Sequence, residues 1–325
     1  MTAQGLPSWL QPAIGRKSAV GRAARRLLGL QKPARKLAEW SIGIYGGTSP
    51  FDIAPLKDVQ NPVLTCRDIS DVDAELVADP FMIQVDGSWF MFFEVQGGRA
   101  RKGSIGLATS SNGLTWHYER IVLTEPWHLS YPYVFREGTD LFMVPESCEA
   151  RTVPLYRATN FPYRWERVHT ILDGVEFADV SPFCYQGGWW LFASSGEPRR
   201  RADNLHLYCA ERLTGPWQEH PMSPVIQNDA RRSRPGGRVL VHEDRVYRFA
   251  QDCYQAYGLE IRAFEITTLT PQVYEERELA ANPVITASGT GWNGTGMHHI
   301  DPHQSVDGSW FASVDGRRAR VPRAY

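Results

Sequence analysis

The sequence contains few cysteines, and none of them has the spacing of a metal or disulfide framework. Only five occur in 325 residues, and no Cys-x-x-Cys pair is present. They are Cys66, Cys148, Cys184, Cys209 and Cys253. An odd number of widely spaced cysteines argues against a disulfide scaffold and against a zinc ribbon. The cysteine content therefore predicts a reducing, cytoplasmic location.

Long apolar runs are also missing, and the net charge is close to zero. No stretch approaches the roughly 20 apolar residues of a transmembrane helix, and the N-terminus shows no apolar segment followed by a signal cleavage site. The 35 basic and 36 acidic residues give a net charge of −1, so the whole chain has no electrostatic attraction to nucleic acid. We therefore expect a globular protein that is not secreted and does not bind nucleic acid.

Acidic residues are absent from the N-terminal segment. Residues 1–38 carry eight Lys or Arg side chains and no Asp or Glu. One interpretation, which we favour, is a solvated and partly disordered leader. The other is a short basic amphipathic helix that makes weak contact with an anionic membrane surface. On this basis we divide the chain into a leader at 1–39, a single domain at 40–316 and a tail at 317–325.

Aromatic residues, in contrast, are abundant, at 12% of the chain with eleven Trp, and they recur in a repeated pattern. Five segments share a proline, an alternating apolar strand, a turn and a second aromatic-rich strand. The repeated prolines are Pro80, Pro132, Pro182, Pro235 and Pro302, at steps of 52, 50, 53 and 67 residues. The predicted turns are Asp86-Gly87, Glu137-Gly138, Gly187-Gly188, Glu243-Asp244 and Asp307-Gly308. A period of this length, made of short strands, indicates a β-propeller.

The strand count predicts how the propeller closes. Each of the first four segments is followed by two further strand patterns, at 105–123, 153–172, 205–225 and 259–280. The fifth ends near Gly316 with only two strands, and residues 40–65 have the layout of its missing half. We therefore predict an all-β, five-bladed propeller in which N-terminal strands pair into the last blade. Such closure removes two exposed sheet edges.

The first strand of each propeller blade lines the central channel, so the residues around the repeated proline should converge on one funnel. Glu94 and Glu146 each follow their proline by 14 residues, and their second strands should return an acid to the same region. The residues expected at the funnel are Asp79, Glu94, Tyr131, Glu146, Asp179, Arg234, His299 and Asp301. A single Asp at a strand start often only caps local N–H groups. Acids at equivalent positions of several blades favour a functional site.

The motif "HHIDPH" at 298–303 raises the question of a metal site. Neighbouring strand residues point to opposite faces, so at most His299, Asp301 and His303 share one side. We interpret His299 as a residue that faces substrate, and we predict no cofactor. A cation in the central channel is the alternative.

The quoted motifs carry a resemblance to known proteins. The Asp79-Pro80 pair and "DVSPF" at 179–183 resemble the five-bladed glycosidase clan of arabinanases, β-xylosidases, invertases and levansucrases. "HLSYPYVF", "MVPES", "RPGGR", "RFAQDCYQAYG" and "WNGTGMHHID" are similar to the N-terminal domain of plant glucosamine inositolphosphorylceramide transferases and to its bacterial stand-alone relatives, over nearly all of 40–316. In the plant proteins a separate glycosyltransferase domain follows, so the resemblance implies carbohydrate handling rather than that transferase activity.

The resemblance to the clan also implies roles for the acids. Asp79 matches the base or nucleophile, Asp179 its orienting partner and Glu146 the general acid, with Glu94 as the alternative acid. Candidate substrate-binding residues are Glu94, Tyr131, Arg234, Gln251, Trp292, His299 and Asp301. The predicted function is cleavage or transfer of a glycosidic bond by paired carboxylates, on a carbohydrate or a glycolipid headgroup. The alternative is a non-catalytic carbohydrate-binding module associated with glycan or glycolipid synthesis.

Overall fold

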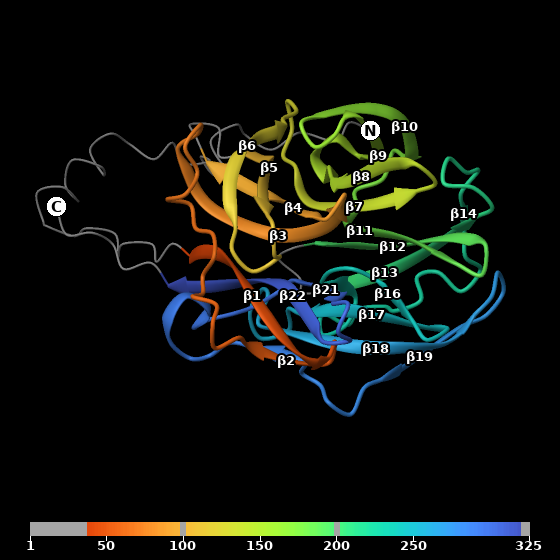
Figure 1. The fold of residues 1–325 in the computed structure, drawn as a ribbon. Helices are drawn as coiled ribbons and strands as arrows, with labels where there is room; N and C mark the ends of the chain where they lie inside the picture. The colour runs from red at the N-terminus through yellow and green to blue at the C-terminus, as the bar shows by residue number, and fades with distance from the viewer. Residues whose placement is uncertain (1–37, 98–101, 198–201, 320–325) are drawn as a thin grey trace, which may run out of the picture. The chain divides into compact units, whose positions relative to one another are not determined.

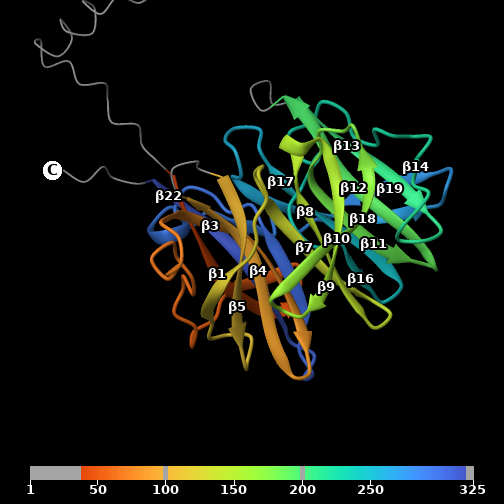
Figure 2. The same ribbon diagram turned by 90° about the horizontal axis from the view of Figure 1, so that it is seen from above.

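The computed structural model describes residues 38–97, 102–197 and 202–319, which form five antiparallel sheets (Figures 1 and 2). Four sheets follow one another in sequence, and the fifth combines strands from both ends of the described chain. This arrangement confirms the predicted all-β, five-bladed propeller. The predicted leader and tail fall mainly on residues 1–37 and 320–325, outside the described residues.

The first three blades each contain four consecutive strands. Blade one is built from β3 (Ala74–Val85), β4 (Ser88–Gly97), β5 (Lys102–Ser110) and β6 (His117–Leu123). Blade two contains β7 (Ser130–Glu137), β8 (Asp140–Glu146), β9 (Thr152–Asn160) and β10 (Arg164–Asp173), with a 3-10 turn η1 (Cys148–Ala150) after β8. Blade three contains β11 (Ala178–Tyr185), β12 (Gly188–Glu197), β13 (Ala202–Ala210) and the short β14 (Gln218–Glu219).

Blade four is the least regular. Its main path is β15 (Arg234–Pro235), β17 (Arg245–Asp252), β18 (Glu260–Leu269) and β19 (Tyr274–Glu278). Two short strands are added: β16 (Leu240–His242) pairs with β17, and β20 (Ile285–Thr286) pairs with β18. A second 3-10 turn, η2 (Gly291–Asn293), precedes the last blade.

Blade five closes the ring as predicted. It has the order β2-β1-β22-β21, formed by β1 (Ala38–Ser49), β2 (Asp52–Pro55), β21 (Ile300–Gln304) and β22 (Trp310–Ala319). The pairing of β1 with β22 is unbroken from Ala38 opposite Ala319 to Gly47 opposite Trp310. The two strands, red and blue in Figure 1, therefore join the ends of the described chain through main-chain hydrogen bonds.

Two of the predicted turns, an Asp-Gly pair and a Glu-Asp pair, form hairpin loops at the predicted positions. Asp86-Gly87 and Glu243-Asp244 form two-residue loops in which both residues have positive φ, the geometry that matches the twist of the flanking strands. Two other predicted turns are displaced by one residue. The pairing of Glu137 with Asp140 makes the loop 138–139, and the pairing of Tyr185 with Gly188 makes it 186–187.

Apolar side chains of neighbouring blades pack against one another and form the core. For example, Phe92 of β4 and Trp165 of β10 meet edge to face, with ring centroids 5.3 Å apart and an interplanar angle of 88°. Phe81, Tyr133 and Val134 of the inner strands are fully or almost fully buried in the same cluster. Aromatic residues from two blades thus fix the angle between the sheets.

The guanidinium of Arg238 links blade four to blades one, two and five. Arg238 follows β15 in blade four, and it donates hydrogen bonds to the carbonyl oxygens of Val134 (3.0 Å) and Met82 (3.1 Å) in blades two and one. It also forms an ion pair with Asp301 of blade five. Met82 and Val134 each lie three residues beyond the first residues of the predicted funnel, Asp79 and Tyr131, so this network lies one level deeper in the channel.

Asp301 belongs to this network and is not a substrate-binding residue as predicted. Its side chain is fully buried, and its Oδ2 accepts a hydrogen bond from the Met82 N–H (2.5 Å) and interacts with His303 Nε2 (3.0 Å). Burial alone would raise the pKa of Asp301, but Arg238 and His303 hold that pKa below its ordinary value. Asp301 is therefore an ionised structural partner.

Replacing Arg238 by methionine is expected to lower the free energy of unfolding by about 3–5 kcal/mol, because Asp301 would stay buried without its counter-ion. Urea denaturation of R238M and of the exposed control R136M would measure the difference. The double variant R238M/D301L should recover part of the loss, because no unpaired charge remains. Equal midpoints for R238M and R136M would show that the pair does not stabilise the ring.

Candidate active site

Three residues at equivalent blade positions adopt left-handed backbone conformations. Asp79, Tyr131 and Asp179 have φ values of 53°, 45° and 53°. Each opens a bulge in an inner strand, directly after a residue paired with the second strand of its blade. These pairs are Ala78–Glu94, Ser130–Glu146 and Ala178–Ser194. The repeat therefore aligns positions 79, 131 and 179, and Pro182, predicted as the equivalent of Pro80, lies two residues too late.

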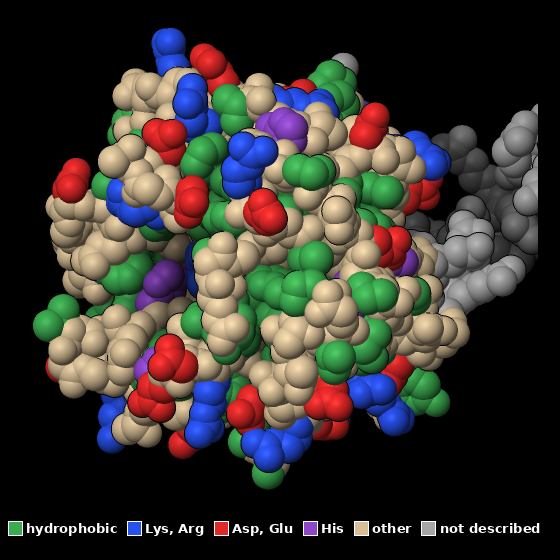
Figure 3. Space-filling model, turned by 90° about the vertical axis from the view of Figure 1, so that its right-hand side faces the viewer, with side chains coloured by type: hydrophobic (Ala, Val, Ile, Leu, Met, Phe, Trp, Pro, Cys, Tyr) green, Lys and Arg blue, Asp and Glu red, His purple; other side chains and the backbone are tan. Residues whose placement is uncertain are grey.

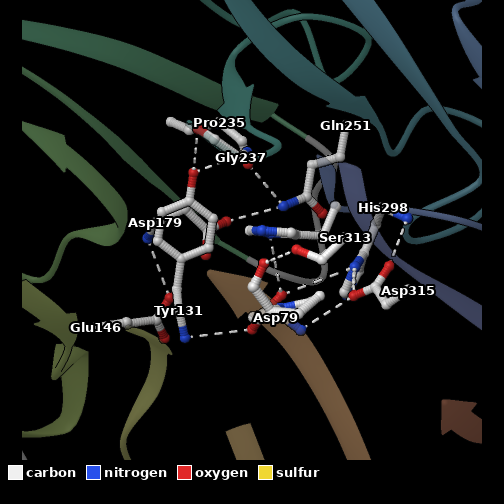
Figure 4. Close-up of polar contacts among 12 residues, drawn as sticks. Asp79, Tyr131, Glu146, Asp179, Pro235, Gly237, Gln251, His298, Ser313 and Asp315 are labelled. Carbon is white, nitrogen blue, oxygen red and sulfur yellow. Dashed lines mark hydrogen bonds and ion pairs between the residues drawn. The ribbon is translucent and has the colours of Figure 1, made fainter. Parts of the chain in front are cut away.

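Carboxylates of the preceding blade hold these three residues in place (Figure 4). The Asp79 N–H donates to Asp315 Oδ2 at 3.1 Å, the Tyr131 N–H to Asp79 Oδ2 at 3.3 Å, and the Asp179 N–H to Glu146 Oε2 at 3.1 Å. A left-handed non-glycine residue costs of the order of 1–3 kcal/mol and persists where its surroundings fix it. Each left-handed residue is therefore held by a hydrogen bond from its main-chain N–H to a carboxylate of the preceding blade.

Asp179 is fixed by two further donors. Arg234 Nε lies 2.5 Å and Gln251 Nε2 lies 2.9 Å from its Oδ2. Arg234 also reaches toward Glu146, with its terminal nitrogen 4.0 Å from Oε2. The second hydrogen bond of the Gln251 amide goes to the Pro235 carbonyl at 2.9 Å. Gln251, predicted to bind substrate, is thus occupied in orienting Asp179, whereas Arg234 lines the cavity.

A second charged group joins Asp79 to blade five. His298 Nδ1 lies 2.7 Å from Asp315 Oδ2 and 3.8 Å from Asp79 Oδ1, and its ring stacks on Trp40 with centroids 3.9 Å apart. Burial alone would lower the pKa of His298, but Asp315 and Asp79 raise it above its ordinary value. His298 therefore lies between two acids that both favour its protonated form. The sequence interpretation missed His298, Trp40 and Asp315, two of which lie on strands outside the inner ring.

His299 does not face substrate as predicted. It is fully buried, with Phe81 and Tyr131 packed edge to face against its ring at centroid distances of 4.5 and 5.5 Å. Burial lowers the pKa of His299 to about 4, so the ring is neutral. The prediction assumed strand alternation from residue 298, but β21 begins only at Ile300. As a result, His298 and not His299 lines the cavity.

Tyr131 and Trp292 are also placed differently from the prediction. Tyr131 is fully buried, and its hydroxyl donates to the Gly237 carbonyl (2.9 Å) while accepting the Gly237 N–H (2.9 Å). Trp292 in η2 packs on blade five, where a Cβ on Gly43 or Gly316 would come within 2.6 or 2.4 Å of its indole. Both side chains are structural: one ties blade two to blade four, and the other covers β1 and β22.

A cavity of about 250 Å³ opens above the carboxylates. Its lining includes Asp79, Glu94, Glu146, Asp179, Arg234 and His298. Glu94 Oε1 lies 3.4 Å from His128 Nε2, at the side of the cavity. Two further hollows, of about 550 and 560 Å³, share Glu146 with it. The structure thus brings together the three acids predicted for catalysis, together with Glu94 and Arg234.

Burial gives these carboxyl groups unequal proton affinities. It raises the pKa of Glu146 to about 8, with a further contribution from Asp179 and a partial opposing effect of Arg234. It raises the pKa of Asp79 to about 7, where His298 opposes the shift and Asp315 adds to it. The pKa of Glu94 is raised well above its ordinary value by burial and then by Asp79 and Glu146. The surroundings thus favour a proton on Glu146 and Glu94, whereas His298 favours the ionised form of Asp79.

Asp79, His298 and Asp315 are the described residues whose ligand atoms could meet a metal ion, since one atom from each lies within 4.8 Å of the others. Both oxygens of Asp315 already accept main-chain N–H groups, from Asp79 at 3.1 Å and from His298 at 3.0 Å. A metal would also have to replace the proton that the two acids favour on His298. The side chains of Asp79, His298 and Asp315 therefore suit an internal ion pair better than a cation site.

Comparison with known proteins agrees with this architecture. Residues 35–317 match the model of the family described as "Glucosamine inositolphosphorylceramide transferase 1, N-terminal". The chain belongs to this family. It is 36% identical over 300 residues to glucosamine inositolphosphorylceramide transferase 1 of Oryza sativa subsp. japonica, and 33% identical over 328 residues to that of Arabidopsis thaliana. These alignments cover 86% and 94% of this chain but only 40% and 42% of the relatives.

More distant solved structures share the propeller fold of this family member. One is Zg3597, a family 117 glycoside hydrolase of Zobellia galactanivorans, with a TM-score of 0.52 and 12% identity over 86% of this chain and 90% of the other. Another is the catalytic domain of a Coprinopsis cinerea GH62 α-L-arabinofuranosidase, with a TM-score of 0.55 and 13% identity over 86% and 96%. At such identities the comparison shows the fold alone.

In this family member, Glu146→Gln is expected to stabilise the fold at alkaline pH. The folded-state pKa of Glu146 is raised from 4.5 to about 8, so the folded protein holds a proton that the unfolded chain releases. The free energy of unfolding should therefore fall as pH rises from about 4.5 through about 8. Glutamine has no proton to lose. Thermal unfolding at pH 5 and pH 9 should show E146Q gaining relative to wild type only at pH 9.

A matched control is Glu166→Gln, since Glu166 is exposed on β10. Its melting temperature should follow the wild type at both pH values. The same pH response in E146Q and E166Q would contradict the buried, protonated state of Glu146.

Proposed function

We propose that this domain cleaves or transfers a glycosidic bond with the carboxyl groups of its central cavity. The observation that carries the proposal is the convergence of Asp79, Glu146 and Asp179 from three blades on one cavity, with raised pKa values of about 7 for Asp79 and about 8 for Glu146. Glycosidic chemistry needs a protonated acid beside the leaving oxygen and an ionised carboxylate opposite it. The name of the relatives, glucosamine inositolphosphorylceramide transferase 1, is in keeping with a carbohydrate substrate.

In the proposed mechanism Glu146 is the general acid and Asp79 the base or nucleophile. His298 favours the ionised form of Asp79, whereas Asp179 favours the protonated form of Glu146. Glu146 donates that proton to the departing oxygen, and Asp79 activates water or attacks the anomeric carbon. Asp179 orients Glu146 by donating its main-chain N–H to Oε2, and Arg234 bridges the two acids. Glu94, whose pKa burial raises well above its ordinary value, is the alternative donor.

A second candidate function is a carbohydrate-binding module. The observation that favours it is the short aligned part of the relatives. The alignments span only 40% and 42% of the rice and Arabidopsis proteins, so the reaction in their name can belong to the part of those proteins that this chain does not match. The same cavity would then hold a glycan or a glycolipid headgroup through its polar lining.

The face in Figure 3 shows acidic and basic side chains interspersed, which gives no support to nucleic-acid binding. None of the helices in the described part of the chain has the length and hydrophobicity of a membrane span.

Product analysis distinguishes the two functions. The protein would be incubated with a panel of oligosaccharides and inositol-containing glycolipid headgroups, and the mixtures analysed by mass spectrometry. Released or transferred sugar units that disappear in D79N would support the enzyme. Binding by calorimetry without any product would support the module and exclude catalysis on the tested bonds. Neither binding nor product across the panel would contradict both functions.

A further inference from the structure

The hollow between blades two, three and four is larger than the central cavity. It has a volume of about 550 Å³, within the range of about 300–1,000 Å³ that is typical of ligand sites. Its lining combines polar groups, such as Asp203 and Ser194, with apolar surface from Ala178 and Cys253. Glu146, Arg234 and Tyr257 line both this hollow and the central cavity, so the two spaces lie side by side.

Tyr257 is the aromatic residue that lies between these two spaces. Tyr257 remains 46% exposed, although most aromatic residues of the described chain are buried. The Arg234 guanidinium covers the ring at 5.2 Å from its centroid, while His298 and Trp40 meet it edge to face at 5.3 and 6.3 Å. Its main-chain carbonyl accepts a hydrogen bond from Arg317 at 2.7 Å. The ring is therefore held in one orientation while much of its surface stays open.

The third hollow differs in chemistry. Among its described lining residues, Lys102 lies 3.6 Å from Glu149, and Arg151 forms an ion pair with Glu176. These described residues present paired charges and no Phe, Tyr or Trp ring. The apolar face of a sugar ring packs on aromatic surface, and its hydroxyls pair with polar groups nearby. The hollow beside Tyr257 meets both requirements, and the hollow beside Lys102 meets only the second.

We propose that Tyr257 is the stacking platform of a second carbohydrate subsite in the hollow between blades two, three and four. This inference rests on the proposed carbohydrate function and narrows its substrate class. The ligand has at least two rings, one in the central cavity and one on Tyr257. Glu146 lines both spaces, so the bond that joins the two rings lies beside its carboxyl group. A single sugar fills only part of the site.

Binding of monosaccharides and oligosaccharides to Tyr257 variants tests the subsite. The probes are an array of mono-, di- and trisaccharides that includes hexosamines and inositol-linked hexosamines, followed by calorimetry on the tightest oligosaccharide and on its component monosaccharide. In the wild type the oligosaccharide should bind more tightly. Tyr257→Ala should reduce this advantage, the ratio of oligosaccharide affinity to monosaccharide affinity, about tenfold. This is the scale at which a well-packed aromatic contact contributes to binding. Tyr257→Phe keeps the ring and should restore the advantage.

Tyr254→Ala is the matched control, because Tyr254 is equally exposed (49%) and packs with Arg231 but does not line either space. Its oligosaccharide advantage should equal that of the wild type. An unchanged advantage in Y257A, or equal wild-type affinity for both probes, would overturn the subsite while leaving the proposed function intact. No binding of any array member to the wild type would contradict the proposed function and the subsite together.

Discussion

Replacing Asp79 by asparagine is expected to lower turnover at least about a hundredfold, the lower end of the contribution of a general acid–base group. The substitution keeps the size of the side chain, and the amide oxygen can still accept the Tyr131 N–H, now at 3.3 Å from Asp79 Oδ2. It removes the negative charge that a base or nucleophile requires. The rate constant should therefore fall, whereas the affinity for the same glycan should change little.

Asp86→Asn provides a matched control within the same blade. Asp86 occupies the first position of the β3–β4 turn with a φ of 50°, where asparagine is well tolerated, and it lies at the opposite end of β3 from the cavity. D86N should turn over substrate at the wild-type rate. Comparison of kcat and of the dissociation constant for D79N, D86N and wild type completes the test. A D79N protein with wild-type kcat would show that the role assigned to Asp79 is wrong.

Deleting residues 1–55 is expected to abolish cooperative folding. The deletion removes β1 and β2, so β22 loses the continuous pairing from Ala38–Ala319 to Gly47–Trp310 and becomes an exposed edge. It also removes Ile42 and Ile44, both fully buried, from the core between blades five and one. Thermal unfolding followed by near-ultraviolet circular dichroism should show no sharp transition, and an apolar dye should bind to the exposed core.

Deletion of residues 1–37 is the control, because it leaves every contact among the described residues in place. This shorter protein should melt cooperatively at the temperature of the full chain. A cooperative transition after the longer deletion, at an unchanged temperature, would contradict the closure of the ring by β1 and β22.

Local sequence pattern is sufficient to identify the acids of the central cavity. The pattern identifies Asp79 and Asp179 because each opens a predicted inner strand, and Glu146 because its strand returns to the same end of the blade. In the structure the two Asp residues lie at bulges within β3 and β11. Register is a local property: once Ser130 pairs with Glu146, strand geometry fixes which end of the sheet carries the acid. The pKa of Glu146 is raised first by burial, which no local pattern shows, and only then by the neighbouring Asp179.

Other assignments needed contacts that no local pattern contains. Gln251 on β17 and Asp301 on the inner strand β21 are polar residues, as a substrate-binding residue would be, yet Asp179 and Arg238 from other blades bind their side chains. Trp292 is an aromatic residue near the last blade, yet it covers glycines of β1 and β22. In each case the partner lies more than 20 residues away in the sequence, so alternation and spacing could not identify it.

The sequence by itself determined the five blades, their closure by N-terminal strands and the blade ends at which acids gather. These properties depend on strand periodicity, turn chemistry and repeat length, all of which are encoded within a few tens of residues. Only the tertiary structure decided that His298 rather than His299 reaches the cavity, that Asp315 and Trp40 hold it, and that Tyr257 stands between two hollows. Those outcomes depend on where a strand starts and on how neighbouring blades meet, because the direction of a side chain at a bulge or loop is fixed by packing between blades and not by alternation.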